Sequence, residues 1–337
     1  MPRRHYFARH LLECSPRMRN IFINQFGRLR SGWRVLVFLA AFLALSFLIA
    51  TVLRIVLVVI GPHASSNTSQ FIAELVFRGA LFAAALGAGY VCARFIEGLP
   101  WRSLGLTFHS GWFRDLVFGF AIGFASLVVA VAVASKGFKF SLGNNGSSSI
   151  IRSMIGSGVI LFLAALAEEA MFRGYGLQTL TRAKLAWLSV LLTSVPFGLV
   201  HLTNPNVVPG VTFANTALAG IWLAAAYLRT RSLWLPLGVH WAWNWALGWF
   251  FGLPISGIQL VSNPLLQTQD NGPKWLTGGS YGIEGGVACT IALVLFTVFL
   301  WKTRWLSATP ELKQMTSEEN PATSEPVLSI RPADDHA

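Results

Sequence analysis

Two adjacent carboxylates and a guanidinium, Glu168, Glu169 and Arg173, interrupt an otherwise apolar stretch of the chain. The eight residues before Ala167 are all apolar, so the three charges lie at or near membrane depth if this segment spans a bilayer. A charge at that depth costs about 2.5 to 3.5 kcal/mol on insertion scales. Ionisable residues in such a position are therefore candidates for a functional site.

Helical spacing gives the two carboxylates different roles. Glu169 and Arg173 are four residues apart and share a helix face, where an ion pair can form. Glu168 is turned about 100 degrees away from that face. We therefore expect Glu169 to be the structural partner of Arg173, which leaves Glu168 without an assigned role. Catalysis is one such role.

Three more polar residues occur in apolar runs further along the chain. His201 follows Phe197 by four residues, and Asn244 follows His240 by the same interval, so each pair shares a helix face. A single membrane histidine usually has a packing role. Two histidines, an asparagine and a glutamate pair on three separate helices indicate more, because intramembrane polar groups normally face the bundle interior and can converge there.

Hydrolysis of a peptide bond is the chemistry that this set could carry. A glutamate beside a histidine can hold and deprotonate a water molecule. A histidine and an asparagine on one helix face can donate hydrogen bonds to the oxyanion of a tetrahedral intermediate. Zinc held by Glu168, His201 and His240 is the alternative, but the HExxH helix is absent, so we favour a site without a metal or other cofactor.

Composition places these residues in an integral membrane protein. Of 337 residues, 54% are hydrophobic and 12% are charged, whereas a soluble domain has about 25% charged residues. Three widely spaced cysteines predict neither a disulfide framework nor a zinc site. The net charge of +12 does not indicate nucleic acid, because eight arginines precede the first apolar run, as expected beside anionic lipid headgroups.

The apolar runs predict an all-α, polytopic bundle of about eight transmembrane helices. Residues 1–33 form a basic cytoplasmic or interfacial arm, either amphipathic or disordered, and residues 305–337 form a disordered polar tail. The transmembrane domain covers residues 34–304. Its predicted spans are about 35–60, 71–96, 116–134, 155–172, 185–202, 211–228, 235–251 and 286–301.

Several local features refine this plan. Gly119 and Gly123 have the spacing that lets membrane helices approach closely. Pro196 and Gly198 predict a kink or break in the fifth span. Residues 141–149 and 257–283 read as loops. Four tryptophans of the seventh span predict an interfacial aromatic belt, namely Trp241, Trp243, Trp245 and Trp249.

Loop charges predict the orientation. With a cytoplasmic N-terminus, most loop arginines and lysines fall on the cytoplasmic side, so both termini are expected there. This topology puts His201 toward the outer end of its helix and His240 near the inner end of its own. For the two to meet, the fifth helix must be shortened or broken around Pro196, or the boundaries must shift.

The motifs resemble those of the CPBP family, which includes type II CAAX prenyl endopeptidases, bacteriocin-processing proteins and abortive-infection proteins. The motif core covers about residues 155–252, and residues 102–106 are similar to a segment often found upstream in bacterial members. The motifs that carry the resemblance are Glu168-Glu169-x-x-x-Arg173, Phe197-x-x-x-His201 and His240-x-x-x-Asn244.

The resemblance implies an intramembrane glutamate endopeptidase. Glu168 would activate water with help from His201, while His240 and Asn244 would form the oxyanion hole. The supporting residues would be Glu169, Arg173 and Phe197. We expect a membrane-associated protein or peptide as substrate and the bacterial inner (plasma) membrane as location. A non-proteolytic scaffold or bacteriocin-immunity protein of the same family remains the alternative, and the oligomeric state stays open.

Overall fold

Eight helices of the computed structural model correspond to the eight predicted spans. The structure describes residues 21–24, 28–60, 67–143 and 146–317, so most of the basic arm and residues 318–337 of the tail lie outside the described residues. The eight helices are α3 (Ser31–Ile60), α4 (Asn67–Val91), α5 (Trp112–Val133), α6 (Ser147–Glu169), α8 (Ala186–His201), α9 (Val211–Thr230), α10 (Trp234–Trp245) and α12 (Val287–Lys302).

Length and composition support a membrane-spanning bundle. Among the described residues, five helical stretches are long and apolar enough to cross a bilayer. Two further apolar helices, α8 and α12, are shorter, at 16 residues each. The five stretches are Ser31–Val56, Gln70–Glu97, Trp112–Val133, Ser147–Arg182 and Val211–Thr230. The chain is therefore an all-α, polytopic membrane protein, as the sequence predicts.

Short elements connect or extend the long helices. Three of them, η2, η5 and η6, are wide π-helical turns that continue α4, α6 and α10. The short helical elements are η2 (Cys92–Glu97), η3 (Trp101–Leu104), η4 (Ser135–Gly137), η5 (Ala170–Gly174), α7 (Tyr175–Arg182), η6 (Ala246–Phe250), α11 (Lys274–Thr277), η7 (Gly279–Tyr281), η8 (Ile283–Gly285) and α13 (Pro310–Ser317).

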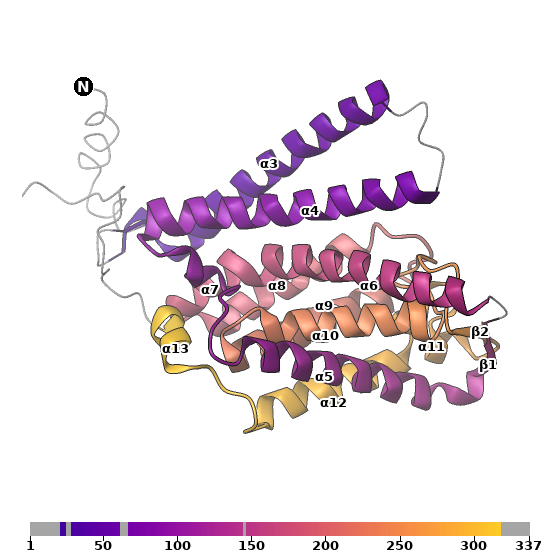
Figure 1. Ribbon diagram of the computed structural model, residues 1–337. Coiled ribbons are helices and arrows are strands. Elements are labelled where there is room, and N and C mark those ends of the chain that lie inside the picture. The colour runs from indigo at the N-terminus through magenta and orange to yellow at the C-terminus, as the bar shows by residue number, and fades with distance from the viewer. Residues whose placement is uncertain (1–20, 25–27, 61–66, 144–145, 318–337) are drawn as a thin grey trace, which may run out of the picture.

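The long helices run side by side and alternate in direction (Figure 1). Helices α3 and α4 form a pair on one side of the molecule and diverge toward the last residues of α3 and the first residues of α4. Helices α6 and α8 follow next, and then α9, α10, α5 and α12. The first ends of α3, α5, α8 and α10 lie at the same end of the bundle as α7 and α13.

A two-stranded sheet lies at the opposite end of the bundle, beside α11 (Figure 1). Strand β1 (Phe138–Leu142) pairs antiparallel with β2 (Leu266–Asp270), with Phe138 opposite Asp270. Both strands overlap segments that the sequence predicts as loops. The difference arises because each five-residue strand is stabilised by a partner more than 120 residues away, which no local pattern reveals.

The beginning of the tail also differs from the prediction of disorder. Helix α13 lies within residues 305–337, and the side chains of Leu312 and Thr316 are buried. Burial of these two residues against the bundle offsets the weak apolar character of the segment, so disorder is the wrong prediction for residues 310–317.

Glycines bring α5 and α10 into backbone contact. A Cβ at Gly119 would lie 2.2 Å from the carbonyl oxygen of Leu235, and a Cβ at Gly123 would lie 2.2 Å from that of Val239. This close approach is the one that the small-residue spacing predicts. The contact also fixes the position of α10 along the bundle axis. Because Val239 directly precedes His240 in the chain, the contact at Gly123 sets the depth of His240 in the bundle.

Three tryptophans of α10 and η6 hold this segment against α6. The indole nitrogens of Trp241, Trp245 and Trp249 donate hydrogen bonds of 3.0, 3.2 and 3.3 Å to backbone carbonyls of α6. The acceptors are Gly158, Met154 and Ile150. The fourth, Trp243, is buried and donates to Glu284 at 3.0 Å. The aromatic belt is thus a wrong prediction: these residues form helix contacts, since their spacing turns them toward α6.

Helix α8 is continuous through Pro196 and ends at His201. The predicted break is therefore absent. Instead, Gly198 and Gly220 let α8 and α9 approach closely: a Cβ at Gly220 would lie 2.7 Å from Cα of Ser194.

Substitution of Gly123 by alanine should destabilise the bundle. The new methyl group would overlap the backbone of α10, which costs about 1 to 3 kcal/mol when a packed interface is overfilled. We expect a lower thermal unfolding midpoint in detergent. Gly79→Ala is the matched control, because nothing lies within 4 Å of the added Cβ. Equal midpoints for the two variants would contradict the close α5–α10 contact.

Candidate active site

Glu169 and Arg173 form the ion pair that their spacing predicts. Both side chains are fully buried, and Arg173 Nη1 donates to Glu169 Oε1 at 3.0 Å. Arg173 Nη2 also donates to the carbonyl oxygen of Gly220 at 3.1 Å, and the guanidinium lies 4.6 Å from the ring centroid of Phe197. The pair therefore joins α6 and η5 to α8 and α9.

A π-helical turn separates the two partners along the chain. Helix α6 ends at Glu169, and η5 carries the chain through Arg173 to Gly174. Such wide turns occur often at functional sites, because they rotate the following side chains relative to a regular helix. Sequence spacing alone does not reveal this turn.

Glu169 also binds His240, a contact that the sequence does not predict. The Nδ1 atom of His240 lies 2.9 Å from Glu169 Oε1. An ionised carboxylate only accepts hydrogen bonds, so Nδ1 carries the proton and donates it. The other ring nitrogen, Nε2, lies 3.8 Å from Glu168 Oε2. One carboxylate thus orients the imidazole, and the other stands at its free nitrogen.

Glu168 differs from its neighbour in its surroundings. Its side chain is 26% exposed, whereas that of Glu169 is fully buried. Glu168 Oε2 is itself buried and has no hydrogen-bond partner among the residues that the structure describes. This oxygen is therefore available as an acceptor for a small molecule such as water.

His201 reaches the same region from the end of α8. Its Nδ1 atom donates to the carbonyl oxygen of Phe197 at 2.7 Å, because a carbonyl can only accept. The Phe197 ring lies between the two imidazoles, with centroids 4.6 Å from His201 and 6.1 Å from His240. The depth problem posed by the sequence is thus resolved without a break in α8, since His240 stands in the middle of α10.

A cavity of about 300 Å³ connects these side chains. All four residues proposed from the motifs line it, namely Glu168, His201, His240 and Asn244. Asn244 is half-buried on its wall. The polar wall thus combines a carboxylate, two imidazoles and an amide from three helices.

Other polar residues of this cavity were not predicted from the sequence. Glu284 accepts hydrogen bonds from Trp243 and from both the backbone and the hydroxyl of Ser256. Glu74 and Arg78 of α4 also line the cavity and form an ion pair of 2.7 Å. The signal for Glu284 was weak: a single acidic residue just before the last apolar run.

The residues do not form a closed zinc site. Among the described residues no group of three His, Cys, Asp or Glu side chains is arranged to hold a metal ion. The Nδ1 atoms of His201 and His240 are both engaged by protein oxygens, so each imidazole presents Nε2, as metal-binding histidines also do. Because no third ligand is arranged with them among the described residues, we derive no step through a metal.

Removing Glu169 should destabilise the protein, whereas removing Glu168 should not. Glu169→Ala leaves Arg173 buried without its partner, which costs about 3 to 5 kcal/mol. Glu168→Ala removes a carboxylate that has only the weak 3.8 Å approach to His240. Thermal unfolding of the two variants in the same detergent measures the difference. A Glu169→Ala midpoint equal to that of the wild type would contradict the division of roles.

The segment that carries the cavity residues is similar to a known protein family. Residues 150–246 match the family model described as type II CAAX prenyl endopeptidase Rce1-like. The match begins in α6 and ends just after α10, and it contains the four proposed residues of the cavity. Comparison of the whole chain with curated proteins gave no match. The family model confirms the resemblance carried by the motifs: residues 150–246 are similar to the Rce1-like type II CAAX prenyl endopeptidases.

Proposed function

We propose that the protein is an intramembrane endopeptidase that hydrolyses a peptide bond of a membrane-associated protein or peptide. One observation carries the proposal: Glu168, His201, His240 and Asn244 line one cavity within a membrane bundle. The match of residues 150–246 to a family model of prenyl endopeptidases supports the reaction class. Glu168 would be the general base and His201 its partner.

Water activation follows from the free atoms of these two residues. Glu168 Oε2 can accept one proton of a water molecule. With Nδ1–H donated to Phe197, a neutral His201 presents Nε2 as a second acceptor. A water held by both acceptors has its lone pairs turned toward the cavity, ready to attack a carbonyl carbon.

His240 and Asn244 would stabilise the oxyanion. The Asn244 amide donates without any change of protonation. His240 donates through Nε2 only when the ring carries both protons, because Nδ1–H is already given to Glu169. In this proposal His240 acts as an imidazolium between Glu168 and Glu169, with Glu169 holding the ring in place.

The location and orientation complete the proposal. The end of the bundle that holds α7 and α13 also holds the first residues of α8 and α10 (Figure 1). Basic residues lie in or next to the elements of this end, including Arg182 in α7, Lys184 just before α8 and Arg231 just before α10. An excess of arginine and lysine marks the cytoplasmic side of a membrane protein. We infer that this end, where α3 begins and α13 lies, is cytoplasmic. We also propose that both termini are cytoplasmic and that the membrane is the bacterial inner (plasma) membrane.

Glu168→Ala and His201→Ala should abolish cleavage while leaving the fold intact. Loss of a general base lowers the rate by about 10² to 10⁴. Proteomics of membrane fractions from cells with wild type or Glu168→Ala would identify the substrate as a cleavage product that disappears. Glu311→Ala, an exposed acidic site far from the cavity, is the control. Cleavage retained in Glu168→Ala would overturn the assignment, and a cellular phenotype that survives it would favour the scaffold or immunity alternative.

Asn244→Ala should lower the turnover of that substrate by about 10² to 10³, the usual effect of losing one oxyanion donor. KM should change far less than kcat, because the hydrogen bond forms in the transition state. Elemental analysis of active wild-type protein and a chelator challenge test the zinc alternative. Stoichiometric zinc whose removal stops cleavage would replace the water-activation scheme above.

A further inference from the structure

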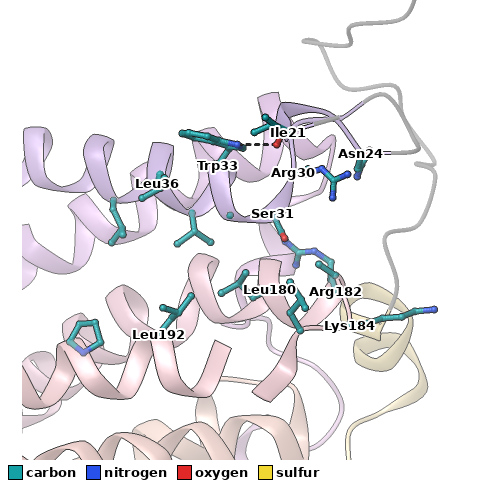
Figure 2. A pocket seen from close by; sticks show the side chains of 16 residues that line it. Ile21, Asn24, Arg30, Ser31, Trp33, Leu36, Leu180, Arg182, Lys184 and Leu192 are labelled. Atoms are coloured by element: carbon teal, nitrogen blue, oxygen red, sulfur yellow. Dashed lines mark hydrogen bonds between the residues drawn. The ribbon is translucent and has the colours of Figure 1, made fainter. Parts of the chain in front are cut away.

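A second, larger cavity of about 1050 Å³ lies outside the candidate active site, between the first turns of α3 and the segment from α7 to α8 (Figure 2). Much of its wall is apolar and exposed, including Leu36, Leu39 and Leu192. Three basic residues, Arg30, Arg182 and Lys184, complete the lining among the described residues, and no acidic side chain is among them. The cavity thus combines a cationic end with an apolar groove.

The cationic end is connected to a buried ion cluster. Glu97 accepts hydrogen bonds from Arg34 at 3.1 Å and from Arg182 at 3.0 Å, and all three side chains are at most 3% exposed. Thr179 also donates to Glu97 at 2.8 Å. The two guanidinium groups thus share one carboxylate, and this contact fixes the position of Arg182 at the wall of the cavity.

Arg182 lines the cavity and has two nitrogen donors that no described residue uses. Its Nη2 atom binds Glu97 and Thr179, whereas Nε and Nη1 are buried and have no hydrogen-bond partner among the described residues. Figure 2 shows Arg182 near Ser31, at the end of the cavity where Arg30 and Lys184 also lie. An anionic oxygen at this position would bind Arg182 by a charge-assisted hydrogen bond.

The apolar wall of the cavity indicates the chemistry of the rest of the ligand. It extends from the cationic end to Leu192 and Pro196 of α8, and its exposed leucines lie on the apolar helices α3 and α8. A small soluble anion would leave these walls uncovered, whereas a hydrocarbon chain would cover them. We propose that this cavity binds an anionic phospholipid, with its phosphate on Arg182 and Ser31 and one acyl chain along Leu36, Leu39 and Leu192.

Native mass spectrometry of the full-length protein tests the proposal. Wild-type protein, stripped of lipid in detergent, is titrated with phosphatidylglycerol and, separately, with phosphatidylcholine of the same acyl chains. We expect phosphatidylglycerol to bind at least about tenfold more tightly, the effect of hydrogen bonds to a charged group. Arg182→Gln should remove this preference. Millimolar inorganic phosphate should not displace the lipid.

Two matched pairs of variants keep the test decisive. Leu192→Trp fills the groove and should weaken both lipids, whereas Leu191→Trp, its exposed neighbour outside the cavity, should weaken neither. Lys136→Gln, at the opposite end of the bundle, is the control for Arg182→Gln. The Leu192 pair decides the question even if Arg182→Gln does not fold. Equal binding of the two lipids, displacement by phosphate, or equal effects of Leu192→Trp and Leu191→Trp would each overturn the proposal.

Discussion

The contact on which the candidate site depends is the double engagement of one buried carboxylate oxygen. Glu169 Oε1 accepts hydrogen bonds from Arg173 at 3.0 Å and from His240 at 2.9 Å. Because Arg173 also binds the backbone of Gly220, this single oxygen connects α6 and η5 with α9 and α10. A fully buried carboxylate is tolerated only when such partners satisfy it. Removal of any one partner would therefore disturb all four elements, and with them the position of the catalytic candidates.

The sequence predicted the local half of this arrangement. The Glu169–Arg173 pair follows from four-residue spacing within one segment, and the eight spans follow from apolar runs. The Glu169–His240 contact could not be predicted in the same way, because it joins residues 71 positions apart. The contact forms only if α10 has the right position along the bundle axis relative to α5 and α6. Backbone contact at Gly119 and Gly123 and indole hydrogen bonds to α6 set that position.

The failed predictions share a physical cause. The tryptophans of α10 looked like an interfacial belt because residue type alone does not say which neighbour an indole N–H meets. The strands β1 and β2 looked like loops because each is short and pairs with a distant partner. At Pro196 the rule that proline breaks a helix gave way to tight α8–α9 packing. In each case tertiary contact overrode a local preference.

Two buried ion clusters stand at either end of one short stretch. At its start Glu169 lies between Arg173 and His240. At its end Glu97 lies between Arg34 and Arg182. In each cluster one buried carboxylate is satisfied by two basic side chains, which is the condition for keeping such a charge inside the bundle. Because η5 and α7 connect the two clusters, the chain from Glu169 to Arg182 is fixed at both ends, and the end of α6 that carries Glu168 is held beside α10.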